Sequence, residues 1–323
     1  MIVYALDIGG SYLKHALIEV SGRRAEIARR FEPCRLGSYR FADLRRAVTS
    51  SAQSVLREEK RLDTIAISTT GSVDRNGTVI RAGHFEDYEN ISWDQILRQE
   101  FPKITRVVTA NDGKASTWAE FVAQGGSLNA FSHFVVGTGI GGGIVVRGEL
   151  VYGDGGYAGY LGHIKVTDKS EVVCSCSRFG CVETVASAPA IVRLFEAKAG
   201  YRASNMTRAP MTLDQIAGAA LEGDKIALEA FETAGGWLGV ALSNVMNILN
   251  PATITIGGGV VLAAQHAVGQ ENGNIFIEAA IQKAKSLAHR RVAAETTIRA
   301  AQHGNDGGLI GAALQTVEPK QHW

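Results

Sequence analysis

Two strand–glycine turn–strand patterns constrain the fold of this chain more than any other feature. The first is ALDIGGSYLKHALIEV at residues 5–20, and the second is HFVVGTGIGGGIVV at residues 133–146. Apolar and β-branched runs on both sides of a glycine cluster predict two strands joined by a tight turn. Because the pattern recurs far along the chain, it predicts two similar lobes rather than one sheet. A length of 323 residues is enough for about two domains.

Helical and buried-strand segments around the two hairpins predict an α/β protein. We expect helices near 41–61, 113–124 and 225–249, and strands at 62–69, 106–112 and 253–259. Asp112 ends the strand RVVTAND, and the chain passes from it into the next helix. Ligand-binding groups stand at such strand ends in parallel sheets, so Asp112 is well placed for catalysis. We place the boundary between the two lobes near this residue.

Composition and charge disfavour several classes of function. Apolar residues make up 46% and charged residues 20% of the chain, and the formal net charge is +1. This balance favours neither a nucleic-acid-binding nor a membrane-binding surface. The first residues reach Asp7 too soon for a signal peptide, and no apolar run attains the roughly 18 residues of a membrane-spanning helix. We therefore expect a cytoplasmic protein whose thiols stay reduced.

Three glycine clusters each follow an apolar strand, at residues 9–11, 137–143 and 257–259. A single cluster of this kind is equally well interpreted as a plain turn. Glycine also lets backbone N–H groups approach a phosphate closely, because it has no Cβ. Three clusters together, with Asp7 and Lys14 beside the first, favour phosphate binding.

The second cluster, GTGIGG at 137–142, formally matches the GxGxxG dinucleotide fingerprint. That fingerprint needs a helix after it, whose N-terminus holds the pyrophosphate. The residues that follow, IVVRGELV, predict a strand instead, and the chain has no GxxxxGK loop followed by Ser or Thr. An NAD-dependent oxidoreductase is therefore the weaker alternative, and we expect a nucleotide to bind between paired hairpins of two lobes.

Three of the four cysteines lie in CSCSRFGCVE at residues 174–183, downstream of His163. Cys174, Cys176, Cys181 and His163 are a complete tetrahedral zinc ligand set, which leaves no open position for a reactive water. Such a zinc site is structural. Loop thiols without a metal and a redox switch are the alternatives, and a reducing compartment disfavours a disulfide knot.

Glu183 follows the last of these cysteines by two residues. A zinc site would immobilise the loop, and a carboxylate held there accepts hydrogen bonds from a polyhydroxylated ligand. The alternative is a solvated loop charge, which the position alone favours.

Taken together, these motifs resemble the ROK family (repressor, open reading frame, kinase) of sugar kinases. The resemblance covers nearly the whole chain and runs through DIGGS with Lys14, TTGSVD, AND at 110–112, GTGIGGGIVVRGELVYG, Gly162-His163, CSCSRFGCVETVAS, IGGG and HGNDGGLIGAA. Its most specific part is the combination of the histidine and the CxCxxxxCxE element with the glycine hairpins.

The resemblance implies a two-lobed fold of the actin-like ATPase superfamily with a structural zinc loop. It also implies ATP with Mg²⁺, and phosphorylation of a hexose or N-acetylhexosamine. We assign residues 1–114 and 303–323 to a smaller lobe to which a C-terminal helix returns, and residues 115–302 to a larger lobe with the zinc loop and a homodimer surface. Family members that repress transcription carry a helix-turn-helix ahead of the kinase-like part. The first predicted strand begins at residue 2, so we do not expect nucleic-acid binding.

The resemblance further implies a role for each matching residue. Asp112 is the general base that takes the proton of the attacking sugar hydroxyl. The residues that hold the sugar are Asn90, Asn111, Asp112, Tyr160, His163 and Glu183. The residues that hold ATP are Asp7, Gly9, Gly10, Ser11, Lys14, Gly137, Thr138, Gly139, Gly257, Gly258 and Gly259.

Tyr160 departs from the family pattern, which has a glutamate two residues before Gly-His. A tyrosine hydroxyl donates and accepts single hydrogen bonds, so it cannot reproduce a carboxylate that accepts from two sugar hydroxyls. The departure leaves three interpretations: a different sugar, weak activity on common hexoses, or a sugar sensor without catalysis. Asp112, Asn111 and Glu183 favour an active enzyme.

Overall fold

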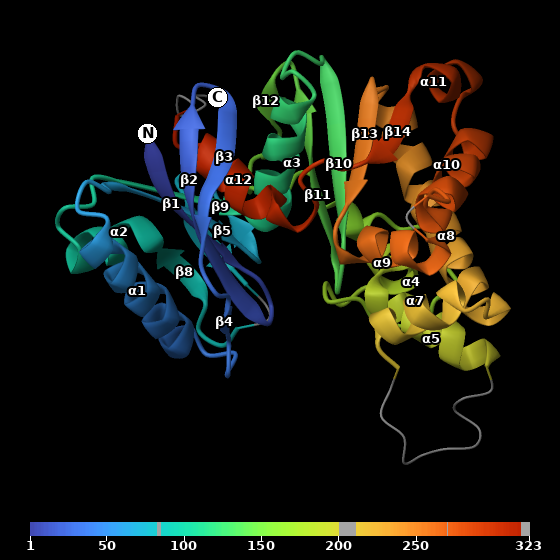
Figure 1. Ribbon diagram of the computed structural model, residues 1–323. Helices are drawn as coiled ribbons and strands as arrows, with labels where there is room; N and C mark the ends of the chain where they lie inside the picture. Colours follow the sequence, from blue (N-terminus) through green and yellow to red (C-terminus); the bar gives the residue numbers. More distant parts are fainter. Residues whose placement is uncertain (83–84, 200–210, 270, 318–323) are drawn as a thin grey trace. The chain divides into compact units, whose positions relative to one another are not determined.

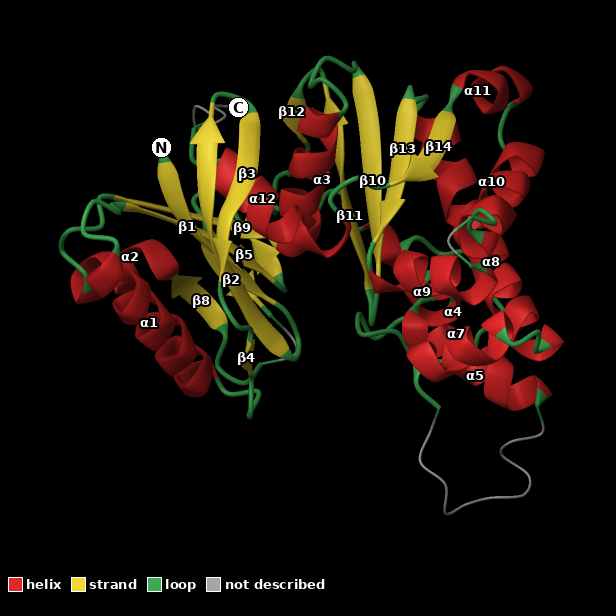
Figure 2. Ribbon diagram, in the orientation of Figure 1, coloured by secondary structure: helices red, strands yellow, loops and turns green. Residues whose placement is uncertain are grey.

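The computed structural model describes residues 1–82, 85–199, 211–269 and 271–317. Runs of strands and runs of helices follow one another along the chain, and the molecule contains both kinds of element, as the sequence predicts (Figure 2). Within these ranges no helix is both long and apolar enough to cross a membrane.

The chain forms two compact units that interleave along the sequence (Figure 1). The first comprises residues 1–127, 143–159 and 306–323, and the second comprises residues 128–142 and 160–305. The sequence-based division after residue 114 differs from this one. Helix α3 (Asp112–Ala123) continues directly from strand β9 (Arg106–Asn111) and packs against helix α12 (Gly307–Leu314), so all of α3 belongs to the first unit. Residues 318–323 of the predicted smaller lobe lie outside the described part of the chain.

A mixed sheet forms the centre of the first unit. Its strand order is β3-β2-β1-β5-β9, and β4 also pairs with β2. Its strands are β1 (Ile2–Ile8), β2 (Tyr12–Ser21), β3 (Arg24–Arg30), β4 (Cys34–Arg35), β5 (Thr64–Thr69) and β9. The first predicted hairpin is confirmed, because β1 and β2 are antiparallel and place Asp7 opposite Lys14. β1, β5 and β9 run parallel, with Asp7 beside Ser68 and Thr69 beside Asn111. The carboxyl ends of these three strands therefore meet at one edge of the sheet.

Side chains of β1 alternate between the two faces of this sheet. Tyr4, Leu6 and Ile8 belong to a buried core that includes the apolar stripe of helix α1 (Phe41–Glu58). Asp7 points to the other face, where α12 packs on β1 and β5. A Cβ added at Gly308 of α12 would lie 2.7 Å from Asp7 Oδ1, so only glycine allows this close approach.

A small sheet and a short helix complete the first unit. The sheet has the order β6-β7-β8, and its strands are β6 (Ser72–Val73), β7 (Thr78–Arg81) and β8 (Glu89–Ser92). Helix α2 (Trp93–Glu100) follows directly after β8. The hydroxyl group of buried Tyr88 bonds to Thr69 Oγ1 at 2.8 Å and accepts from Trp93 Nε1 at 2.7 Å. This network fastens the start of α2 to the end of β5.

The second unit is built on three parallel strands, β10 (Ala130–Val136), β13 (Thr253–Gly257) and β14 (Thr297–Ala300). With β11 (Ile140–Val146) and β12 (Glu149–Leu150) the strand order is β12-β11-β10-β13-β14. β11 begins in the second unit and ends in the first. Because β11 is a strand, the GTGIGG segment lacks the following helix that a dinucleotide fingerprint needs.

Helices make up most of the rest of the second unit. Its helical elements are η1 (Leu161–His163), α4 (Glu183–Ala186), α5 (Ala188–Lys198), α7 (Leu213–Leu221), α8 (Lys225–Leu249), α9 (Gly259–Val268), α10 (Ile275–Leu287) and α11 (Arg290–Glu295), and η2 (Gly304–Asp306) leads into α12. The predicted bounds of α8 are confirmed. Asp224 caps its start by accepting from two backbone N–H groups, and Asn250 ends it in the left-handed conformation with a φ of 45°. α10 packs along α8, and α7 packs against α9.

Candidate active site

Asp7 stands near the end of β1 and is buried. Its Oδ1 accepts a hydrogen bond of 2.7 Å from Ser68 Oγ, and its Oδ2 lies 3.5 Å from Lys14 Nζ. Sequence reasoning missed Ser68, because only the strand register places this residue of a buried strand beside Asp7. A carboxylate, a hydroxyl and a cation at the edge of a parallel sheet are suited to bind phosphate and the metal ion that accompanies it.

Asn111 and Asp112 stand at the change from β9 to α3. Asn111 Oδ1 accepts from the backbone N–H of Lys114 at 3.0 Å, which caps the helix, and Asn111 Nδ2 donates to the carbonyl oxygen of Gly71 at 2.8 Å. Asp112 Oδ1 accepts from Asn111 Nδ2 at 2.9 Å and from the N–H of Gly113 at 2.7 Å. The first turn of a helix thus orients the carboxylate and favours its negative charge.

The pKa of Asp112 is raised to about 7. Burial of the carboxyl group is the main cause and the charge of Asp7 adds to it, whereas the hydrogen bonds from Gly113 and Asn111 oppose the shift. A carboxylate whose pKa lies near neutrality is partly deprotonated and still basic enough to take a proton from a hydroxyl group. Asp112 therefore has the properties of a general base.

The first glycine turn, residues 9–11, joins β1 to β2 and is partly open to solvent. The N–H of Gly9 donates to the carbonyl oxygen of Tyr12 at 3.0 Å and closes the turn. The turn begins two residues after Asp7 in the chain, as phosphate binding beside a charged pair would require. Asn90, another sugar-binding candidate of this unit, lies in β8 and therefore belongs to the separate small sheet. Its side chain is exposed and its φ is 55°.

The second glycine turn is bonded to Glu183, the first residue of α4. Glu183 Oε2 accepts from the backbone N–H of Ile140 at 3.0 Å, and Oε1 accepts from Ser175 Oγ at 2.8 Å. A Cβ added at Gly139 would lie 2.7 Å from Glu183 Oε2, so this bond needs glycine at position 139. Glu183 is half-buried and hydrogen-bonded on both oxygens, which argues against a freely solvated loop charge.

The four predicted metal ligands come together. His163, Cys174, Cys176 and Cys181 offer ligand atoms that all lie within 4.8 Å of one another. The Sγ atoms of Cys176 and Cys181 are 3.6 Å apart, and Cys174 Sγ lies 3.4 Å from His163 Nδ1. In a tetrahedral zinc site, thiolates about 2.3 Å from the metal stand roughly 3.8 Å apart. Donor set and separations therefore fit a structural zinc ion.

The three thiols lie close enough to affect one another's protonation. Burial, together with the neighbouring thiols, raises the pKa of Cys181 to about 12. A cluster in which thiolates disfavour one another is stabilised when a divalent metal ion neutralises their charge.

Tyr160 precedes η1, the short helix that carries His163. The rings of Tyr160 and His163 are stacked, with centroids 6.1 Å apart and an angle of 13° between their planes. The departure from the family pattern therefore lies on the ring of a candidate metal ligand.

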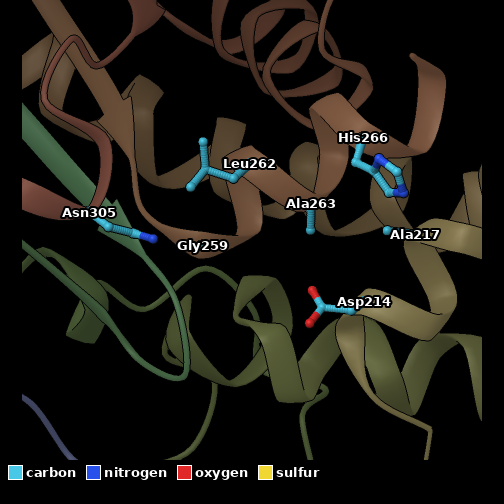
Figure 3. A pocket seen from close by; sticks show the side chains of 7 residues that line it. All are labelled: Asp214, Ala217, Gly259, Leu262, Ala263, His266 and Asn305. Carbon is cyan, nitrogen blue, oxygen red and sulfur yellow. The ribbon is translucent and has the colours of Figure 1, made fainter. Parts of the chain in front are cut away.

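A pocket of about 400 Å³ lies beside the third glycine cluster (Figure 3). Its walls come from α7, α9 and the η2 turn, and the lining residues are Asp214, Ala217, Gly259, Leu262, Ala263, His266 and Asn305. Apolar walls with a few polar groups are typical of small-molecule sites. Sequence reasoning identified the glycines here but missed Asp214, His266 and Asn305, because no local pattern links three separate segments.

Comparison with known proteins agrees with this picture. The model of the ROK family matches residues 3–318. The chain is 29% identical to a glucokinase of Halalkalibacterium halodurans over 320 residues. The matched region covers 95% of this chain and 92% of that protein. Over 321 residues the chain is 28% identical to an N-acetylmannosamine kinase of Escherichia coli O7:K1, with 99% and 100% covered.

The fold has a counterpart of known structure. A ROK family glucokinase from Streptomyces griseus, solved in complex with glucose and AMPPNP, superimposes with a TM-score of 0.78 over 97% of this chain and 98% of that one, at 23% sequence identity. This likeness confirms the expected fold class, the two-lobed α/β fold of actin-like type.

Proposed function

The chain belongs to the ROK family, and on this basis we propose that it transfers the γ-phosphoryl group of ATP to a hydroxyl group of a hexose or N-acetylhexosamine. The observation that carries the proposal is Asp112, a carboxylate at the end of a parallel strand whose pKa is raised to about 7. The relatives named glucokinase and N-acetylmannosamine kinase support the substrate class.

In the proposed reaction, the Asp112 carboxylate takes the proton of the attacking sugar hydroxyl. The sugar oxygen forms a bond to the γ-phosphorus while the bond from that phosphorus to the β,γ-bridging oxygen breaks. The products are the sugar phosphate, ADP and protonated Asp112, which returns its proton to solvent. Asn111, which donates to Asp112 Oδ1, orients the carboxylate for this transfer.

We assign sugar binding to two groups of residues. Asn90, Asn111 and Asp112 belong to the first unit, and Tyr160, His163 and Glu183 to the second. Zn²⁺, when bound by His163 and the three cysteines, would supply a rigid cross-link beside Glu183. Its role is therefore structural and involves no step of the reaction.

We assign ATP binding to the three glycine clusters. The phosphate-binding candidates are Asp7, Gly9, Gly10, Ser11, Lys14, Gly137, Thr138 and Gly139, whose backbone amides and charges suit phosphate oxygens. Gly259 lines the pocket between α7 and α9, and Gly257 and Gly258 directly precede it in the chain. We assign the adenosine to this pocket and to these three glycines. Mg²⁺ would neutralise the charge of the β- and γ-phosphates, and Asp7 is the carboxylate of the first unit that would hold it or its water.

The proposal extends to assembly and location. We propose a homodimer formed through the second unit, which light scattering of the purified protein tests directly. A cytoplasmic location follows from the need for ATP and for reduced zinc-binding thiols.

A sugar sensor without catalysis is the second candidate function, and Tyr160 is the observation that favours it. Its ring stacks on His163 in the place of a carboxylate. This candidate differs in one measurable respect, because a sensor binds a sugar and releases no ADP.

The deciding experiment measures ADP release from ATP and Mg²⁺ across a panel of hexoses and N-acetylhexosamines. We expect turnover with one sugar class and a loss of about 10²- to 10⁴-fold in Asp112→Asn, since this is the range of general base catalysis. Asp94→Asn is the matched control, because Asp94 also lies in the first turn of a helix but is exposed. Equal rates in both variants would contradict the role of Asp112, and sugar binding without turnover would support the sensor.

A further inference from the structure

Lys114 is a buried cation for which the proposed reaction has no use. It is the third residue of α3, and only 1% of its surface is exposed. Its Nζ donates a hydrogen bond of 2.9 Å to the carbonyl oxygen of Gly156 and lies 5.5 Å from the centroid of the Tyr152 ring. A buried ammonium group costs free energy unless it is hydrogen-bonded or paired. A carbonyl oxygen and an aromatic face offset part of that cost.

Both of these contacts belong to the same loop, residues 152–159. The loop is rich in glycine, and Gly153, Gly156 and Gly159 have φ values of 68°, 76° and 81°. Its internal backbone bonds include one of 2.9 Å from the N–H of Ala158 to the carbonyl oxygen of Tyr152. A loop with so much conformational freedom needs ties to its surroundings to adopt one shape. Lys114 supplies two such ties from a single side chain.

The loop is also fitted closely to the rest of the first unit. A Cβ added at Gly156 would lie 3.0 Å from the carbonyl oxygen of Val73, and one added at Gly159 would lie 3.1 Å from the Cα of Gly143. The loop ends one residue before Tyr160, the position at which this chain departs from its family. A small displacement of the loop would therefore move the backbone on which Tyr160 stands.

The charge of Lys114 acts on the same helix turn that carries Asp112. Burial lowers the pKa of Lys114 to about 8, and the negative charge of Asp112 opposes this shift. Because an electrostatic interaction acts on both partners, the ammonium group also favours the ionised form of Asp112. Other charged and titratable groups around these two include Asp7, which raises the pKa of Asp112, Lys14 beside Asp7, Tyr152, and Arg75, whose positive charge acts on Tyr152.

We propose that Lys114 is a positioning residue for phosphoryl transfer, which fastens the loop at residues 152–159 to the first turn of α3. Lys114 touches neither substrate, and acts through Asp112 and through the loop that leads to Tyr160. The inference rests on the proposed kinase function, but its structural part is testable without turnover.

The test compares Lys114→Met with Lys103→Met. Methionine has nearly the length of lysine without its charge or its donors, so Lys114→Met removes the ties and keeps the volume. Lys103 is the matched control, because its Nζ also donates to a carbonyl oxygen, that of Leu56, at 2.9 Å. Hydrogen exchange of the free protein reports on the loop, and steady-state kinetics from pH 6 to pH 9 report on the reaction.

We expect Lys114→Met to speed amide exchange in residues 152–159 about tenfold or more, and Lys103→Met to leave it unchanged. We also expect kcat to fall about 10- to 100-fold, the range that a displacement of about 1 Å causes, while KM for ATP changes less than about threefold. The midpoint of the pH dependence of kcat/KM should move upward, since Asp112 loses a neighbouring cation. Lys114→Arg should restore part of the protection, because it keeps the charge and a donor.

Tyr152→Leu provides a second test if Lys114→Met does not fold. It removes the aromatic face and keeps the lysine, so the same loop should exchange faster by a smaller factor. Unchanged loop exchange in either folded variant would overturn the inference. Faster loop exchange in a protein that turns over no sugar would support the fastening of the loop and count against the kinase function alone.

Discussion

The two glycine turns that precede a second strand share a local sequence plan, but the molecule holds them in different ways. Each turn has a backbone bond of its own, from the N–H of Gly9 to the carbonyl oxygen of Tyr12 and from the N–H of Gly137 to the carbonyl oxygen of Gly139. The first, at residues 9–11, is bonded from outside by backbone alone, because the carbonyl oxygen of Ser11 accepts from the N–H of Leu36. The second, at residues 137–142, is bonded to a side chain from outside, because Glu183 accepts from the N–H of Ile140. The outside bond of the first turn is therefore made by backbone, and one of the second is made by a carboxylate two residues beyond a candidate metal ligand, Cys181. Similar hairpins can therefore have different causes of order.

Removal of the metal should produce the largest difference in amide exchange between the two turns. We expect chelation, or Cys181→Ser, to speed exchange of the Ile140 amide about 100-fold or more, since the metal loop that carries Ser175 and Glu183 loses its cross-link. The Gly9 amide should change by less than about twofold. Hydrogen exchange at single-residue resolution measures both amides in one sample.

Cys34→Ser is the control for this experiment, because Cys34 lies in β4, outside the metal cluster. Zinc content measured by elemental analysis should be about one per chain in the control and near zero in Cys181→Ser. Equal protection of both amides in the metal-free protein would contradict the dependence of the second turn on the metal loop.

The pH dependence of kcat/KM tests a residue of the first unit, Asp112. With a pKa of about 7, the deprotonated fraction of Asp112 falls from roughly nine-tenths at pH 8 to roughly one-tenth at pH 6, so kcat/KM should fall about tenfold. A profile that stays flat between these values would rule out Asp112 as the titrating base. Rates should be measured with saturating Mg²⁺, so that metal binding does not contribute.

The same carboxyl group links pH to stability. Its pKa in the folded protein, about 7, lies above the ordinary value of 3.8, so the folded state binds the proton more tightly than the unfolded state. The contribution of protonated Asp112 to the free energy of unfolding is fully present below about pH 4 and is lost as the pH rises through 7. Asp112→Asn should therefore unfold at a higher temperature than the parent protein at pH 8 and lose this advantage at pH 4, as thermal unfolding at both values would show.

Glu183→Ala would test the bond itself with the metal in place. We expect exchange of the Ile140 amide to rise about fivefold to tenfold, less than after metal removal, because the cysteine loop keeps its shape. Loss of a hydrogen bond to a charged acceptor accounts for an effect of this size. Glu183→Gln, which keeps an acceptor oxygen, should have a smaller effect, and an equal effect of both variants would contradict the role of the bond.

Asp214→Asn should have the smallest effect. Asp214 lines the pocket between α7 and α9 in the second unit and is not one of the candidate metal ligands. We expect KM for ATP to rise about two- to threefold, by loss of one charged contact at an exposed site, with KM for the sugar unchanged. The change should persist in zinc-depleted protein, and a change in KM for the sugar alone would exclude adenosine from this pocket.

Local signals in the sequence were enough to predict much of the fold. The bounds of α8 followed from an apolar repeat that stops at Asn250-Pro251, and the first hairpin followed from the glycines between two apolar runs. The ligands of the metal site were equally accessible, because cysteines are rare and their chemistry is specific. Features of this kind depend on residues that are close in the sequence or unusual in type.

Other parts of the site depend on tertiary contacts and could not be predicted. Ser68 reaches Asp7 only through the register of two parallel strands. The burial of Lys114 arises from a loop about forty residues downstream, and nothing in the sequence around α3 indicates it. The boundary of the first unit was displaced for the same reason, because the partner of α3 is a helix from the other end of the chain.

That helix, α12, has a consequence for the order in which the chain matures during synthesis. It covers the face of β1 and β5 that carries Asp7 and inserts glycines against α3, where a Cβ at Gly311 would lie 1.7 Å from the carbonyl oxygen of Ala115. Residues 160–305 of the second unit leave the ribosome before α12 does. Protein synthesis proceeds at about 5–20 residues per second. The face around Asp7 is therefore synthesised on the order of ten seconds or more before α12, which packs on it. The second unit therefore has time to fold first, and the edge of the sheet that carries the candidate general base is completed only after α12 has been synthesised.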